Sequence, residues 1–199
     1  MSMASWFSVS LDDITLARAR RGDLAALEAV CRAFEAPVYT LARRLVGTPH
    51  DAEEVLQDTF LEVVRSIGRY RGDGSFAGWI RQVAASKALG RLRYRRVRAG
   101  ETSLDSDGDG EAPPEPAFEP AHPGDRLDVA TALERLSDSA RAVVWLHDVE
   151  GYTHDEIGAL MGRTASFSKS QLARAHARLR DVLAGQGETE QCTRTLANS

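Results

Sequence analysis

The stretch that decides the fold is THDEIGALMGRTASFSKSQLARAHARLRDVLA, residues 153–184. Thr153 and Glu156 match a capping box, in which each side chain accepts a hydrogen bond from the backbone N–H of the other residue. The short helix that follows is expected to end at Gly162, since glycine adopts a left-handed conformation without strain. After a short turn, a longer helix runs over residues 165–184. Two helices joined in this way predict a helix-turn-helix.

The second helix of a helix-turn-helix normally lies in the major groove of DNA. Residues 157–180 contain five lysine or arginine residues and no aspartate or glutamate. Glutamine can bond adenine and lysine or arginine can bond guanine, whereas serine suits phosphate or either base. The residues predicted to contact DNA are Arg163, Ser166, Ser168, Lys169, Ser170, Gln171, Arg174 and Arg178. The alternative is a small helical hairpin with a solvated basic face.

Upstream of this motif, apolar residues recur at helical spacing. They predict one helix that ends at Gly151 and carries Leu133, Leu136, Ala140, Val143 and Val144.

The N-terminal half also shows helical spacing, in four apolar stripes, and predicts a bundle of about four helices. The stripes are Leu24, Leu27, Cys31 and Phe34; Val38, Leu41, Ala42 and Leu45; Leu56, Phe60, Val63, Val64 and Ile67; and Ile80, Val83 and Ala84. Thr48 and Pro49 supply an N-cap and a first-position proline for the third stripe. A loop over residues 69–75 precedes the fourth.

Between the two helical regions, residues 101–125 hold acidic residues but no lysine or arginine, and are rich in proline and glycine. Such a segment buries too little apolar surface to offset its ordering entropy. We therefore predict an all-α fold with two small helical domains, 11–98 and 126–184, a flexible acidic linker, 99–125, and an unstructured tail, 185–199. No apolar run is long enough to cross a bilayer, and the first residues do not resemble a signal peptide, so we expect a cytoplasmic protein without membrane insertion.

The formal net charge of −4 conceals a strong segregation of charge. Residues 79–100 contain seven basic residues and no acid. They follow a loop with Tyr70, and basic side chains interleaved with aromatic ones suit single-stranded DNA. We interpret Phe76 and Trp79 as core residues and Tyr70 as the better candidate for stacking on a base.

Acidic residues cluster on the predicted helix after Thr48, where His50 lies beside Asp51 and Glu54. A metal-dependent nuclease could use these residues. We favour a solvated helix face instead, because no second cluster of Asp, His or Cys completes a metal or catalytic site. We therefore expect no enzymatic activity, no cofactor and no bound metal.

Three sets of residues resemble the extracytoplasmic-function sigma factors, the smallest class of the sigma-70 family. They are Asp51-Ala-Glu-Glu-Val-Leu-Gln-Asp-Thr-Phe60; Tyr70-Arg-Gly-Asp73 with Phe76 and Trp79-Ile80; and Gly151-Tyr-Thr-His-Asp-Glu-Ile157 with Lys169-Ser170 and Arg174-Ala175. The resemblance covers both predicted domains, in the order of sigma regions two and four. It implies an RNA polymerase sigma factor that directs promoter recognition and strand opening.

The resemblance also implies which residues meet which partner. The first domain would bind the clamp helices of core RNA polymerase through Asp51, Glu54, Gln57 and Asp58. It would bind the melted minus-ten element through Ser66, Tyr70, Arg71, Val83, Ser86, Lys87 and Arg91. The second domain would bind the polymerase flap and the minus-35 duplex. Ala173 would face the minus-35 element together with Lys169, Ser170 and Arg174. An anti-sigma factor is a further expected partner.

One other hypothesis is a stand-alone helix-turn-helix regulator that binds duplex DNA without polymerase. Such a regulator holds its operator tightly by itself, whereas a sigma factor with a single recognition helix is expected to bind DNA weakly when free.

Overall fold

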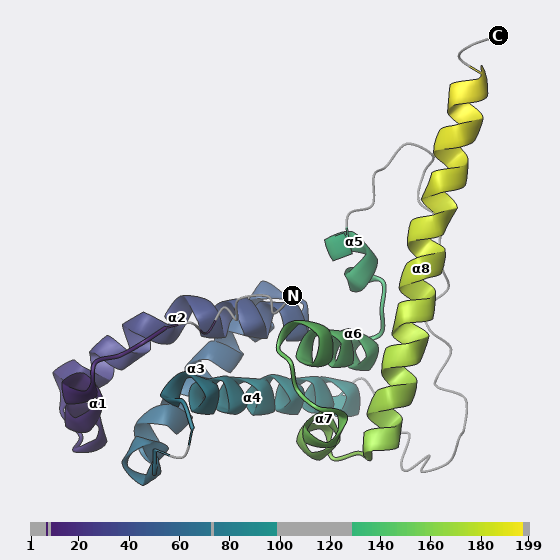
Figure 1. Ribbon diagram of the computed structural model, residues 1–199. Coiled ribbons are helices and arrows are strands. Elements are labelled where there is room, and N and C mark those ends of the chain that lie inside the picture. Colours follow the sequence, from purple (N-terminus) through teal and green to yellow (C-terminus); the bar gives the residue numbers. More distant parts are fainter. Residues whose placement is uncertain (1–6, 8, 73, 99–128, 197–199) are drawn as a thin grey trace. The chain divides into compact units, whose positions relative to one another are not determined.

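The computed structural model describes residues 7, 9–72, 74–98 and 129–196, with side chains from residue 131 to 182 in its C-terminal part. Regular secondary structure in these residues is helical throughout (Figure 1), so the predicted all-α class is confirmed. The chain forms two compact units, residues 1–102 and 103–199, which agrees with two helical domains. The predicted linker, 99–125, lies outside the described residues. None of the described helices is long and apolar enough to span a membrane.

The first unit begins with two helices that aspartates cap, α1 (Asp13–Arg20) and α2 (Leu24–Val46). Asp12 accepts a hydrogen bond from the Thr15 amide, and Asp23 accepts one from the Ala26 amide. Helix α1 is absent from the sequence-based prediction. The first two apolar stripes lie on the single helix α2, which continues through Pro37. Proline removes one backbone hydrogen bond, and the burial of apolar side chains on both sides of it offsets that loss.

Helix α3 (Pro49–Ser66) begins as predicted, with Pro49 in its first turn and the Thr48 side chain accepting from the Asp51 amide at 3.2 Å. It ends in a 3-10 turn, η1 (Ile67–Arg69), and α4 (Phe76–Arg98) follows the loop. Helices α2, α3 and α4 pack against one another, and α1 packs against α2 (Figure 1). Fully buried side chains from all three form the core: Phe34, Leu45, Val55, Val63 and Ile80.

The second unit begins with α5 (Val129–Glu134), α6 (Asp138–Val144) and a π-helical turn, η2 (Trp145–Val149). The prediction of one helix through Leu133 and Ala140 is therefore wrong. Ser137 interrupts it, because its side chain accepts a hydrogen bond from the Ala140 amide and starts a new helix.

The helix-turn-helix consists of α7 (His154–Met161) and α8 (Ala165–Leu196). Both hydrogen bonds of the predicted capping box are present, and Gly162 has a left-handed conformation with φ 65°. Helix α8 runs to Leu196, where an unstructured tail was expected from residue 185. The segment has no proline, and each residue that extends an existing helix adds a backbone hydrogen bond, so its glycines do not end the helix.

Candidate nucleic-acid and polymerase interfaces

The two helices of the helix-turn-helix approach each other closely at Gly158. A Cβ atom at this position would lie 2.8 Å from the Arg163 carbonyl oxygen, and the Arg163 amide donates a 2.8 Å hydrogen bond to the Gly158 carbonyl. Ile157 is fully buried beside this contact, and Leu172 and Ala175 are buried on α8. The turn is thus held by backbone contacts between α7 and the segment that leads into α8.

The outward face of α8 carries five of the residues considered for DNA contact. Those exposed to solvent are Ser166, Lys169, Ser170, Ala173 and Arg174. Two others, Ser168 and Gln171, are 0% and 7% exposed, respectively. Their prediction as base-reading residues is wrong, because they share the inner face of the helix with Leu172 and Ala175.

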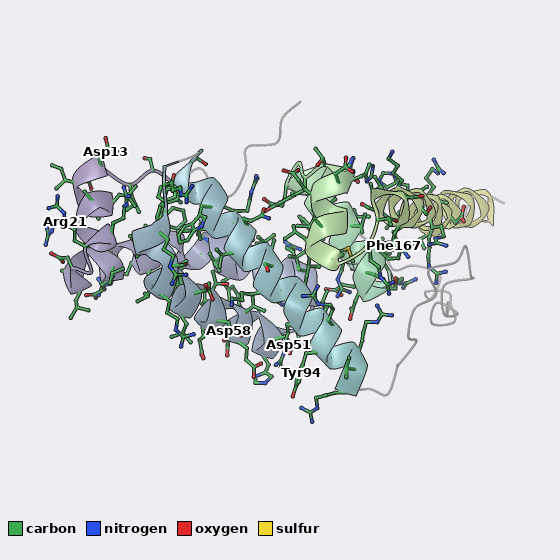
Figure 2. All side chains as sticks on the ribbon, turned by 90° about the horizontal axis from the view of Figure 1, so that it is seen from below. Asp13, Arg21, Asp51, Asp58, Tyr94 and Phe167 are labelled. Carbon is green, nitrogen blue, oxygen red and sulfur yellow. The ribbon has the colours of Figure 1, made fainter. Side chains whose placement is uncertain are left out.

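Two arginines at either end of this face are partly exposed. The Arg163 guanidinium lies 5.7 Å from the ring centroid of Phe167, near the start of α8 (Figure 2). Arg178 is half-buried one turn after Arg174. Their predicted contacts with DNA remain predictions.

In the first unit, Tyr70 belongs to an aromatic cluster. Tyr70 is 9% exposed, and its ring lies 5.2 Å from the ring of Phe76 and 5.6 Å from that of Trp79, measured between centroids. Its hydroxyl donates a 2.7 Å hydrogen bond to the Gly74 carbonyl. Tyr70 therefore offers no open face for a base in this structure. The expectation that Tyr70 stacks on a base is corrected, because the partly exposed rings of Phe76 and Trp79 cover it.

Several residues predicted for minus-ten binding lie near the end of α3 and along α4. Lys87 pairs with Glu62 at 3.1 Å, and the Ser66 hydroxyl donates to the Glu62 carbonyl at 2.6 Å. Glu62 thus joins α3 to α4 through its carboxylate, while its backbone carbonyl holds the Ser66 side chain within α3. Ser86 and Arg71 are exposed, and Val83 is partly exposed.

The structure corrects the roles expected of Asp51, Glu54 and Arg91. Asp51 is 6% exposed and pairs with Arg91 at 2.7 Å and with Arg95 at 3.0 Å. Arg91 also pairs with Glu54. Figure 2 shows Asp51 beside the part of α4 that carries Tyr94. These side chains join α3 to α4, so Asp51 and Arg91 are engaged within the unit. The sequence of each helix by itself suggested that Asp51 and Arg91 are exposed. The packing of α3 against α4 pairs them with each other instead.

The carboxylate of Asp51 is held in its charged form. Burial by itself raises its pKa, but hydrogen bonds from Thr48, Arg91 and Arg95 outweigh burial and hold the pKa below the ordinary value of 3.8. As the pH falls through this lowered pKa, protonation of Asp51 would break the ion pairs that join α3 to α4.

Gln57 and Asp58 remain exposed on α3, as expected of residues that contact polymerase. Two apolar side chains lie on the same side of the helix, Leu61 at 53% and Val64 at 45% exposure. The prediction that Val64 belongs to the apolar, core-facing side of this helix is therefore wrong. The signal was available, because 57, 61 and 64 are spaced by four and three residues.

The second unit contains a group that the sequence analysis did not identify. This histidine cluster consists of His147, Asp148, His154 and His176. Asp148 contacts His147 Nδ1 at 2.8 Å and His176 Nε2 at 2.6 Å. The rings of His147 and His154 stack with centroids 4.5 Å apart, and His154 Nδ1 lies 3.0 Å from the Ser168 hydroxyl. Among the described residues, no group of His, Cys, Asp or Glu is arranged to hold a metal ion.

We expect His154 to titrate below pH 6.5. Burial lowers its pKa, and the charges of His147 and Lys169 lower it further. The stability linked to this group is therefore complete above pH 6.5 and is lost as the pH falls through the depressed pKa. NMR titration of the full chain measures the pKa directly. His147→Gln should raise it, and His50→Gln in the first unit should not. A His154 pKa that is insensitive to His147→Gln contradicts the stacked arrangement.

The exposed basic face of α8, held on a capped helix pair, defines a helix-turn-helix protein with a second helical unit. Comparison with known families makes the assignment specific. Residues 31–98 match sigma-70 region 2, and residues 126–179 match sigma-70 region 4. The chain belongs to the extracytoplasmic-function class of the sigma-70 family of RNA polymerase sigma factors.

Relatives in two organisms support this membership. The chain is 37% identical over 168 residues to the ECF RNA polymerase sigma factor SigE of Mycolicibacterium smegmatis. The aligned region covers 82% of this chain and 65% of SigE. The chain is also 33% identical over 173 residues to the RNA polymerase sigma factor CarQ of Myxococcus xanthus. That aligned region covers 87% of this chain and 96% of CarQ. The chain thus spans less than two thirds of SigE and almost all of CarQ.

Two solved structures share the fold. CnrH, solved in complex with the cytosolic domain of CnrY, has a TM-score of 0.51 and 22% identity, with 86% of this chain and 96% of that chain covered. The sigma factor RpoE, solved with the anti-sigma factor NepR from Bartonella quintana, has a TM-score of 0.50 and 20% identity, covering 84% and 98%. At these identities the likeness concerns the fold.

Proposed function

We propose that the two units divide promoter recognition between them. Helix α8 reads the minus-35 duplex, and the first unit captures the melted minus-ten strand while α3 contacts the clamp helices of core RNA polymerase. The observation that carries this proposal is the exposed face of α8. It presents Lys169, Ser170 and Arg174 on a helix whose inner face is buried against the rest of the helix-turn-helix.

The minus-35 assignment rests on charge and reach. Arginine and lysine form the commonest specific contacts with guanine in the major groove, and serine suits phosphate. The corrected set excludes Ser168 and Gln171 and retains Arg163, Ser166, Lys169, Ser170, Ala173, Arg174 and Arg178.

The set of residues assigned to the minus-ten strand is also smaller, because Tyr70 and Arg91 are engaged within the unit. Arg71 and Ser86 are exposed, and Ser66, Val83 and Lys87 are partly exposed around the end of α3 and along α4. Tyr70 supports this surface from beneath, through its contacts with Phe76 and Trp79. Melting DNA requires a surface that retains the unpaired strand, and unpaired bases are retained by stacking and by basic side chains.

The polymerase contact is assigned to one face of α3. Gln57, Asp58, Leu61 and Val64 combine exposed polar and apolar groups, the composition of a protein interface. Glu54 borders this face but is paired with Arg91. An anti-sigma factor remains an expected partner, as RpoE has in NepR.

We expect Arg174→Ala to weaken minus-35 recognition by about 1–3 kcal/mol, because it removes a side chain able to contact a base pair. The DNA is a duplex selected from a library with a randomised minus-35 element, by holoenzyme made of core polymerase and the full chain. Affinity is measured by competition binding, and transcription in vitro reports the effect on initiation.

Arg180→Ala is the matched control. It removes the same charge from an exposed position of α8 that points about 120° away from Arg174 around the helix axis. Equal affinities for wild type and Arg174→Ala contradict the assigned face. Tight, specific binding by the free chain, with no transcript from the holoenzyme, indicates the stand-alone regulator instead.

A further inference from the structure

We propose that the histidine cluster positions the recognition helix and so determines which minus-35 bases it reads. This inference rests on the proposed reading of the minus-35 duplex by α8. It assigns a role to His147, Asp148, His154 and His176, none of which lies on the outward DNA-facing set defined above.

The cluster makes a closed circuit of contacts through three elements. Asp148 on η2 reaches His176 on α8 with one carboxylate oxygen and His147 with the other. His147 stacks on His154 of α7, with the two ring planes 18° apart. His154 then meets the Ser168 hydroxyl, which returns the circuit to α8.

The two contacts with α8 lie on either side of the residues that would read DNA. Ser168 and His176 are eight residues apart, which is about 12 Å along a helix. Lys169, Ser170 and Arg174 lie between them. Two attachment points on one helix restrict both its rotation about its own axis and its movement along that axis.

The apolar contacts of α8 are less selective. Leu172 and Ala175 bury apolar surface, and such burial is favourable in any register that excludes water. Hydrogen bonds depend on distance and angle, so those of Ser168 and His176 favour one register over its neighbours.

The exposure of the cluster distinguishes positioning from simple stabilisation. The side chains of His147, Asp148 and His176 are 34%, 35% and 44% exposed. Interactions this exposed contribute little to the free energy of folding. A small rotation of α8, in contrast, displaces the end of a side chain such as Arg174 relative to a base pair.

The backbone of η2 contributes to the arrangement. The Glu150 amide donates a 3.0 Å hydrogen bond to the Trp145 carbonyl, five residues earlier. Such π-helical turns are uncommon, and they change the direction in which the following side chains point. Here the turn contains both His147 and Asp148.

The surroundings of the cluster are mixed in charge. The groups that face His154 are His147 and Asp148 of η2, Asp155 of α7 and Lys169 of α8. Lys169 is also on the outward face of α8, so the cluster is adjacent to the surface that it would position.

The test compares base preference with affinity. Holoenzymes made of core RNA polymerase and the full chain, as wild type, Asp148→Ala, Asp148→Asn or Asp181→Ala, are given a promoter library with every single-base change in the minus-35 element. Asp148→Ala should change the relative preference at one or more positions by about fivefold or more. Its thermal unfolding should shift by less than about 5 °C, because the contacts are exposed.

Two variants serve as controls. Asp148→Asn should keep the wild-type preferences, because an amide can accept from one histidine and donate to the other. Asp181→Ala removes an exposed carboxylate from α8 outside the cluster and should also keep them. His176→Ala and His176→Gln repeat the comparison at the other end, where the glutamine amide can replace the Nε2 donor.

The outcomes are distinct. Altered preferences for Asp148→Ala and His176→Ala, with wild-type preferences for Asp148→Asn and His176→Gln, support the inference. A uniform loss of affinity with unchanged preferences, or no change at all, overturns it while the proposed function stands. A wild-type holoenzyme without any minus-35 preference overturns the proposed function, and this inference with it.

Discussion

Replacing Gly158 with leucine should unfold the helix-turn-helix. Even a Cβ atom at this position would lie 2.8 Å from the Arg163 carbonyl oxygen, and the obstructing atoms belong to the backbone of the turn. A larger side chain could be accommodated only if α7 and α8 moved apart. Overpacking of this kind costs about 1–3 kcal/mol, or more where the backbone cannot move. We therefore expect a loss of about 3 kcal/mol or more.

The measurement is thermal unfolding of the full chain, followed by circular dichroism and by NMR signals of the second unit. A loss of about 3 kcal/mol lowers the Tm of a unit of this size by more than about 10 °C. Ala159→Leu is the control, since Ala159 is the exposed neighbour on the same helix. If the two variants unfold at the same temperature, the close approach at Gly158 does not exist in solution.

Removing the Asp51 carboxylate should have the second large effect. Asp51→Ala removes the anion that joins both Arg91 and Arg95 to the start of α3, and only the pair of Arg91 with Glu54 remains there. Breaking one partner of a buried pair costs about 3–5 kcal/mol. The arginines are 26% and 37% exposed and can turn to water, so we expect about 2–3 kcal/mol from the first unit.

Chemical denaturation of the full chain, monitored through the NMR signals of the first unit, measures this loss. Asp58→Ala is the control, because Asp58 is an exposed acid two turns further along the same helix. The difference between Asp51→Ala and wild type should shrink as the pH falls below 3.8, since protonation of Asp51 then removes the same interactions in the wild-type chain. Equal stability at pH 7 contradicts the proposed role of the pair.

Some elements were predictable because their signals are local. The Thr153 and Glu156 side chains and the Thr48 side chain bond backbone groups three residues away, and such bonds depend little on the rest of the chain. The capping box, the start of α3 and the helix-turn-helix were accordingly predicted correctly. Ser137 had the same local character and was overlooked, because the apolar spacing across it suggested one continuous helix.

The site residues were less predictable because exposure is set by distant segments. Arg91 and Asp51 are forty residues apart in sequence, and Lys87 and Glu62 are twenty-five apart. No spacing rule pairs residues so far apart. Asp51, Lys87 and Arg91 were therefore assigned to DNA or polymerase, although they form ion pairs within the first unit. The burial of Ser168 and Gln171 likewise depends on which face of α8 packs against the other helices.

The sequence by itself determined the helical class, the two units, the helix-turn-helix and the family, because caps, apolar periodicity and motif order are properties of short segments. The tertiary structure alone decided that α2 continues through Pro37, that Tyr70 is covered by aromatic rings and that four side chains from three elements meet as the histidine cluster. The physical reason is the same in each case. Packing brings together residues that are far apart in the chain, and burial then determines which polar groups must find partners inside the protein and which remain for DNA or polymerase.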